Sequence, residues 1–184
     1  MIDRQIPGVT LKTRVRDNSI GGPNPFHWLD MSVRQEFAGK KVVVFSLPGA
    51  FTPTSSNEQC PADERLNDEF KAAGVDAVYC IAVNDAFVMY QWGKGLGLER
   101  VKLLPDGSGH FTRRMGMLID KDHVGFGLPS WRYATIVDDN RVTVWFEEPG
   151  INDTGVDEDP YCETAPEKVL EAAKQGIARA LETA

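Results

Sequence analysis

The chain has 184 residues, which fits one domain with a sizeable core, and its hydrophobic and charged fractions of 42% and 26% are those of an ordinary soluble globular protein. Its net charge of -7 argues against nucleic acid or an anionic membrane surface as the main partner, because both bind clustered lysine and arginine. No apolar run approaches the ~20 residues of a membrane span, and the N-terminus lacks the apolar core of a signal peptide. We therefore expect a single cytoplasmic domain over residues 1–184.

Apolar runs and turn signals along the chain predict its helices and strands. Residues 1–40 are polar and turn-rich, and no element is predicted there. Beyond them, the patterns predict a strand at 41–47, a helix at 55–73, a strand at 77–83, a helix at 86–96, a short strand at 101–104, a short helix at 111–115, a hairpin of 133–137 with 142–146, and a closing amphipathic helix at 165–184.

Local signals refine these elements. Asn84 and Asp85 are candidate caps for the helix at 86–96, and Thr164 with Glu167 matches a capping box ahead of the closing helix. The closing helix carries an apolar stripe made of Val169, Leu170, Ala173, Ile177 and Leu181. A strand-helix half followed by an antiparallel half predicts an α/β fold with a mixed central sheet and helices on both faces. This is the thioredoxin-like layout, although the pattern alone does not separate it from other α/β sandwiches.

The segment from Pro48 to Ser55, PGAFTPTS, joins a buried strand to a helix start. Such a junction presents free backbone N–H groups and a partial positive charge, so it can hold an anion or stabilise a thiolate. Two prolines stiffen the loop by fixing φ. On these grounds alone, a proline-rich connector with one capping hydroxyl is the favoured interpretation of the segment.

The sequence PGAFTPT followed by Cys and Ser is the active-site signature of the peroxiredoxin-5-like branch of the peroxiredoxins, which includes type II and hybrid peroxiredoxin-glutaredoxin proteins. This chain resembles that signature, with Ser55 in place of the cysteine. Further segments resemble the family in the same order: GVDAVYCIAVNDAFVMYQWGK, LLPDGSGHFTRRMGM and SWRYATIVDD. The resemblance covers roughly residues 1–165.

The resemblance implies a thioredoxin-like fold and a peroxidase that reduces hydrogen peroxide and small organic hydroperoxides without a cofactor or metal. The peroxidatic cysteine falls at Ser55. The family threonine falls at Thr52, where it would hydrogen-bond the peroxide, and the shielding proline falls at Pro48. The family arginine matches Arg132, whose charge would lower the thiol pKa and stabilise the leaving oxygen. The resulting sulfenic acid is resolved by a second thiol.

A serine at position 55 has no readily formed anion near neutral pH and no sulfenic acid chemistry, so we expect negligible peroxidase activity. A serine hydrolase is a poor alternative, because no histidine lies in this segment and there is no G-x-S-x-G motif. Ser55 is then either an engineered Cys→Ser change or a natural loss of activity. If it is natural, the alternative is a binding or interaction protein that keeps the fold.

The chain has three cysteines, Cys60, Cys80 and Cys162, which is neither a disulfide framework nor a zinc-site spacing. Each resembles a resolving cysteine of a different peroxiredoxin branch. If none resolves the sulfenic acid, glutathione with glutaredoxin, or thioredoxin, is the expected reductant. The resemblance also implies a homodimer, and Asp63 falls near the family's dimer contact, where a carboxylate would weaken an apolar interface.

Overall fold

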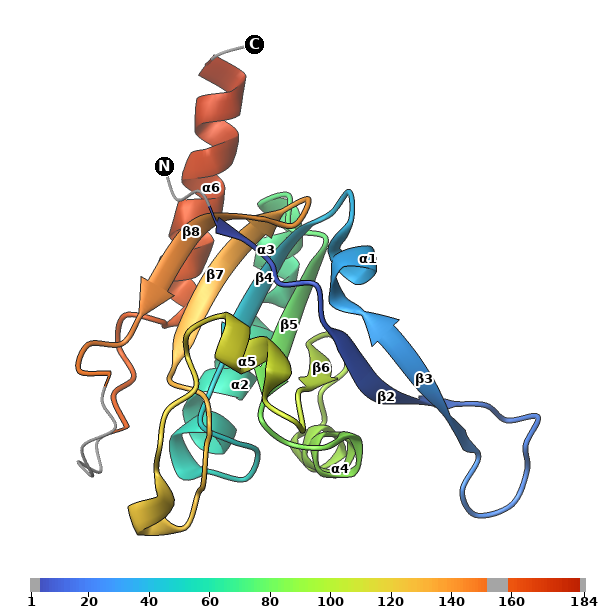
Figure 1. The fold of residues 1–184 in the computed structure, drawn as a ribbon. Helices are drawn as coiled ribbons and strands as arrows, with labels where there is room; N and C mark the ends of the chain where they lie inside the picture. Colours follow the sequence, from blue (N-terminus) through green and yellow to red (C-terminus); the bar gives the residue numbers. More distant parts are fainter. Residues whose placement is uncertain (1–3, 152–158, 183–184) are drawn as a thin grey trace.

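The computed structural model describes residues 4–151 and 159–182, and it describes side chains only as far as residue 176. A six-stranded mixed sheet has the spatial order β1-β8-β7-β4-β5-β6 (Figure 1). Strands β4, β5 and β6 are parallel, and β7, β8 and β1 are antiparallel to their neighbours. In chain order these strands are β1 (Arg4–Gln5), β4 (Lys41–Ser46), β5 (Ala77–Ala82), β6 (Lys102–Pro105), β7 (Tyr133–Asp138) and β8 (Arg141–Glu147).

Helices cover both faces of this sheet, as predicted. Side chains alternate along a strand, so Val42 and Val44 of β4 enter one core while Val43 and Phe45 enter the other. The first core contains residues of α1 and α5, and the second contains residues of α2, α3, α4 and α6. The bounds are α1 (Val33–Phe37), α2 (Cys60–Arg65), α3 (Asn67–Ala72), α4 (Ala86–Leu96), α5 (His110–Arg114) and α6 (Pro166–Glu182).

The first 40 residues contain structure that the sequence did not predict. Strands β2 (Thr10–Arg16) and β3 (Phe26–Ser32) form an antiparallel hairpin that extends away from the main sheet (Figure 1). Most of β3 is exposed, so its residues lack the alternation of apolar and polar side chains that marks a half-buried strand.

The predicted helix at 55–73 is divided into three pieces. A π-helical turn spans Ser55–Gln59, in which the Cys60 N–H donates to the Ser55 carbonyl; α2 and α3 follow. Pro61 has no N–H to continue the ladder of helical hydrogen bonds. Leu66, with φ -88° and ψ 5°, then separates α2 from α3. Leu66 packs against the same core as Phe70, four residues later.

The N-terminus of α4 has a side-chain cap, whereas the capping box expected at α6 does not form. Of the two candidate caps, Asp85 is the one that caps α4, since its carboxylate accepts from the N–H groups of Phe87 and Val88 at 2.9 Å each. The capping box was wrong, because α6 begins at Pro166 and the Thr164 hydroxyl donates to Glu148 at 2.8 Å.

The last elements of the chain are the β7–β8 hairpin and helix α6. The hairpin of β7 and β8 turns at Asp139 and Asn140, both with positive φ, as a two-residue turn requires. The stripe residues Val169, Leu170 and Ala173 are buried, whereas Ile177 and Leu181 lie outside the described side chains. No described helix has the length and hydropathy to span a membrane.

Candidate active site

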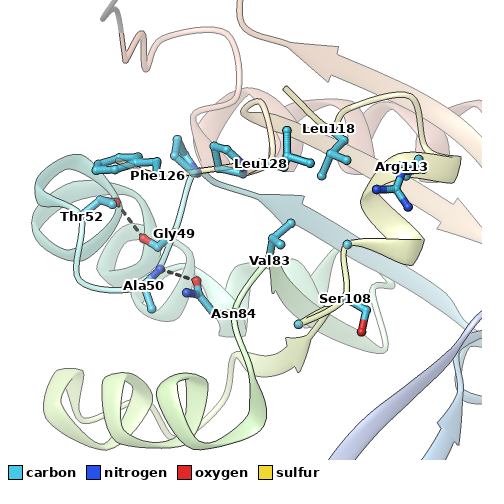
Figure 2. Close-up of a pocket in the computed structure, with 14 residues that line it drawn as sticks. Gly49, Ala50, Thr52, Val83, Asn84, Ser108, Arg113, Leu118, Phe126 and Leu128 are labelled. Atoms are coloured by element: carbon cyan, nitrogen blue, oxygen red, sulfur yellow. Dashed lines mark hydrogen bonds between the residues drawn. The ribbon is translucent and has the colours of Figure 1, made fainter. Parts of the chain in front are cut away.

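The loop after β4 is held in a strained conformation at the carboxyl end of the parallel strands. Phe51 has a φ of 66°, an unfavourable value for a bulky residue that costs on the order of 1–3 kcal/mol. The Ala50 N–H donates to Asn84 Oδ1 at 2.9 Å, which ties this loop to the end of β5 (Figure 2). The loop is therefore anchored from a second strand rather than by its prolines alone.

Ser55 opens the π-helical turn and is fully buried. Thr52 Oγ1 lies 2.7 Å from Ser55 Oγ and 2.7 Å from the Gly49 carbonyl oxygen. The next residue, Ser56, points elsewhere, since its hydroxyl accepts from the Trp92 indole at 3.0 Å. The hydroxyl at position 55, and not its neighbour, is thus the one that contacts Thr52.

The pairing of β4 with β7 brings Arg132 to this loop. The last residue of β4, Ser46, pairs with the first residue of β7, Tyr133, so Arg132 lies beside the point where the loop leaves β4. Its side chain is 1% exposed, which excludes a surface ion pair. The pairing of β4 with β7 thus brings Arg132 near Ser55, although the two residues are 77 positions apart in the chain.

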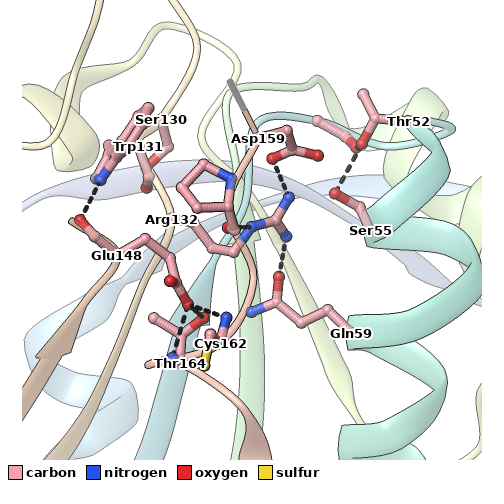
Figure 3. Close-up of polar contacts among 12 residues, drawn as sticks. Thr52, Ser55, Gln59, Ser130, Trp131, Arg132, Glu148, Asp159, Cys162 and Thr164 are labelled. Atoms are coloured by element: carbon pink, nitrogen blue, oxygen red, sulfur yellow. Dashed lines mark hydrogen bonds and ion pairs between the residues drawn. The ribbon is translucent and has the colours of Figure 1, made fainter. Parts of the chain in front are cut away.

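The Arg132 guanidinium is surrounded by acceptors (Figure 3). It donates to Gln59 Oε1, to Asp159 Oδ1 and, at 3.1 Å, to the Pro160 carbonyl, and it lies 5.6 Å from the centre of the Tyr161 ring. Gln59 is one helical turn after Ser55, so the two residues share a helix face. The cation consequently sits next to the same face of the helix as the Ser55 hydroxyl.

Two pockets open beside Thr52. One, of about 460 Å³, is lined by Gly49, Asn84, Arg113 and Phe126 among others (Figure 2). The other, of about 340 Å³, includes Pro48, Thr52, Trp131 and Asp159. Pro48 and Thr52 line both. The structure therefore groups Pro48, Thr52, Ser55 and Arg132 at one end of the sheet.

Comparison with known proteins matches residues 30–162 to the Redoxin family model. Peroxiredoxin y4vD of Sinorhizobium fredii is 56% identical over 173 residues, which cover 94% of this chain and 92% of that protein. This chain belongs to the peroxiredoxin family. The hybrid peroxiredoxin hyPrx5 of Haemophilus influenzae is 41% identical over 161 residues, which cover 88% of this chain and 61% of that longer protein.

A solved structure extends the similarity to the fold. Reduced Prx3 of Vibrio vulnificus in complex with H2O2 matches with a TM-score of 0.79 and 36% identity, over 96% of this chain and 98% of that chain. The thioredoxin-like peroxiredoxin fold predicted from the sequence is thus confirmed. As in the prediction, this peroxiredoxin combines a mixed sheet with helices on both faces.

Glu148 holds the segment that covers Arg132. This carboxylate is 1% exposed and accepts, at 2.8 Å each, from the N–H groups of Cys162 and Thr164 and from the Thr164 hydroxyl (Figure 3). Its backbone N–H donates to the Arg132 carbonyl at 3.2 Å. Burial alone would raise the pKa of Glu148, but the bonds from Thr164 and Cys162 outweigh it, and the pKa is lowered.

Asp63 is buried inside the chain, at 2% exposure, rather than displayed on its surface. It therefore does not lie at an exposed dimer contact, and the expectation from the sequence that it does was wrong. Its Oδ2 has no hydrogen-bond partner among the described residues. Burial, followed by repulsion from Glu167, raises the pKa of this carboxyl well above its ordinary value.

The three cysteines differ in access. Cys60 and Cys80 are fully buried, whereas Cys162 is exposed, and all three are free thiols. The Lys168 ammonium lies 3.8 Å from the Cys162 sulfur. Among the described residues, no group of three or more His, Cys, Asp or Glu side chains is placed to hold a metal ion.

Sequence reasoning missed the residues that position Arg132. Gln59 could have been found, because it lies four residues after Ser55 and so on the same helix face. Asp159 and Glu148 carry no local signal, since each meets its partner only after the sheet and the 159–164 segment have formed.

We predict that Glu148→Gln lowers the free energy of unfolding by about 1–3 kcal/mol at pH 7, because a charged acceptor of three hydrogen bonds is lost. The folded-state pKa of Glu148 is lowered, so its contribution is present above the unfolded pKa of about 4.3 and is lost as pH falls through the folded value. Urea unfolding from pH 3 to 8 measures this. The exposed Glu171→Gln is the control; equal losses in both variants would contradict the assignment.

For Asp63 the free energy of unfolding depends on pH in the opposite direction. A raised folded-state pKa means that stability falls as pH rises from the unfolded pKa toward the folded one. We predict that Asp63→Asn unfolds at higher urea concentration than the parent at pH 8, and that the two converge near pH 3. The exposed Asp122→Asn should show no such trend. Parallel pH profiles for Asp63→Asn and the parent would show that the carboxyl is not buried.

Proposed function

We propose that the activity of this peroxiredoxin is centred on position 55 and that the chain with Ser55 is an inactive form of a thiol peroxidase. The reaction is the reduction of hydrogen peroxide and small organic hydroperoxides. The observation that supports this most strongly is the contact between the Ser55 and Thr52 hydroxyls, one helical turn from the Arg132–Gln59 hydrogen bond. The proposed unit is the whole chain, residues 1–184, as a single peroxiredoxin domain.

The proposed chemistry needs a thiolate where Ser55 stands. The thiolate sulfur attacks one peroxide oxygen, the O–O bond breaks, and the sulfur becomes a sulfenic acid while water or alcohol leaves. Arg132 stabilises both the thiolate and the negative charge that develops on the leaving oxygen. Thr52 holds the peroxide by hydrogen bonding, and Pro48 shields the site. A serine hydroxyl supplies neither the anion nor the oxidisable atom.

For the reductant we propose glutathione with glutaredoxin. Two of the candidate resolving thiols, Cys60 and Cys80, are fully buried, which favours an external thiol. The pocket of about 460 Å³ beside Thr52 is lined by Arg113, a fitting partner for the carboxylates of a small peptide thiol. Cys162 is the internal alternative, because it is exposed and lies in the turn that Glu148 holds near Arg132.

We also propose that the protein is a homodimer. Phe51, Phe126 and Leu128 are 64%, 52% and 49% exposed. Phe126 and Leu128 both line the pocket beside Thr52, so a second copy would cover them next to the site. Asp63 is not part of this face, so it gives no reason to expect a weakened dimer. The cytoplasmic location stays a prediction.

We predict that Ser55→Cys converts a chain with negligible peroxidase activity into an active enzyme, with a gain of at least ~10³-fold, because it restores the nucleophile in an otherwise complete site. Peroxide consumption would be measured with glutathione plus glutaredoxin and, separately, with thioredoxin. Faster turnover with the first pair supports the proposed reductant.

The matched control is Ser56→Cys, which places a thiol one residue later, against Trp92 instead of Thr52. It should stay inactive. A folded Ser55→Cys protein that consumes no peroxide with either reductant would overturn the proposal and favour a non-enzymatic binding protein.

A further inference from the structure

Behind the site, two cysteine side chains meet in the core. Cys60 is the first residue of α2, and Cys80 lies in β5, where it pairs with Phe45 of β4. Both side chains are fully buried and belong to the core that packs α2 and α3 against the sheet. The Cys80 thiol lies close enough to Cys60 for the two to interact electrostatically. They form the dithiol that we call the Cys60–Cys80 pair.

The surroundings of Cys80 favour the protonated form of its thiol. Burial, contact with Cys60 and the nearby Asp63 all raise the pKa of the Cys80 thiol, while the Arg132 cation opposes them. The thiolate is the nucleophile and the protonated thiol reacts poorly. Reaction of the pair therefore requires a change in its surroundings that makes a thiolate accessible.

Helix α2 provides the weak point at which that change can occur. Its first residue, Cys60, is preceded by the π-helical turn and followed by Pro61, which cannot donate a backbone hydrogen bond. Leu66 interrupts the helix six residues later. A six-residue helix with irregular ends has few hydrogen bonds to hold it, so local opening exposes Cys60 without unfolding the sheet.

We propose that Cys60 and Cys80 close to an intramolecular disulfide when a hydroperoxide oxidises one of them, independently of the residue at position 55. One sulfur attacks a peroxide oxygen, the O–O bond breaks, and a sulfenic acid and an alcohol or water are formed. The second sulfur attacks the sulfenic sulfur, an S–S bond forms, the S–O bond breaks, and water leaves. Two thiols and one hydroperoxide thus give one disulfide, one alcohol and one water.

This disulfide would tie α2 to β5 directly after Gln59, the residue that accepts from Arg132. The oxidation state of the pair is therefore linked to the helix turn that carries both position 55 and Gln59. The Cys60–Cys80 pair is a redox site in its own right, because neither sulfur is the nucleophile of the proposed peroxidase reaction.

The test uses the chain as it stands, with Ser55, so that no thiol at position 55 interferes. The protein is treated with hydrogen peroxide, with and without urea below the unfolding transition. Free thiols are then alkylated after denaturation, and tryptic peptides are analysed by mass spectrometry. We expect two of the three thiols to disappear together, a linked Cys60–Cys80 peptide to appear, and dithiothreitol to restore both; sub-denaturing urea should accelerate the loss.

Matched variants separate the pair from the exposed cysteine. Cys162→Ala should keep the disulfide, whereas Cys60→Ala and Cys80→Ala should each lose it. Recovery of Cys60 and Cys80 as free thiols at all urea concentrations, or a disulfide that contains Cys162, would overturn the proposal. Neither result bears on the activity of Ser55→Cys, so failure here is distinguishable from failure of the proposed peroxidase function.

Discussion

A cation buried to 1% exposure is the constraint that organises this end of the molecule. An arginine withdrawn from water must be paired and hydrogen-bonded, or the cost of desolvation is not recovered. Arg132 meets that demand with Asp159, Gln59 and the Pro160 carbonyl, contributed by two segments on either side of it. The π-helical turn supplies Gln59, and the segment that Glu148 holds supplies Asp159 and the Pro160 carbonyl.

Much of the fold was predictable because it rests on local signals. The run of valines in β4, the cap at Asp85 and the positive-φ turn of the last hairpin each reflect a rule that acts within a few residues. The β2–β3 hairpin escaped prediction because most of β3 is exposed. The break at Leu66 escaped because a helical pattern continues through it in the sequence.

The residues of the site also differ in whether the sequence could reveal them. Pro48, Thr52, position 55 and Arg132 were all assigned through the family resemblance, and only the first three lie in one motif. The acceptors that hold Arg132 depend on contacts across the chain and have no motif. The environment of Asp63 was misjudged for a related reason: a polar residue on a helix is usually solvated, and only packing of α2 against the sheet reveals its burial.

The most direct test of this account is the pKa of the thiol in Ser55→Cys, followed by the pH dependence of its alkylation or of its thiolate absorbance, with Cys162→Ala included to remove the exposed thiol. Arg132 and the helix start should together place that pKa at least ~1 unit below the ordinary value of about 8.5, and Arg132→Gln should raise it. A pKa at or above 8.5, unchanged by Arg132→Gln, would contradict the claim that this site is built to stabilise an anion at position 55.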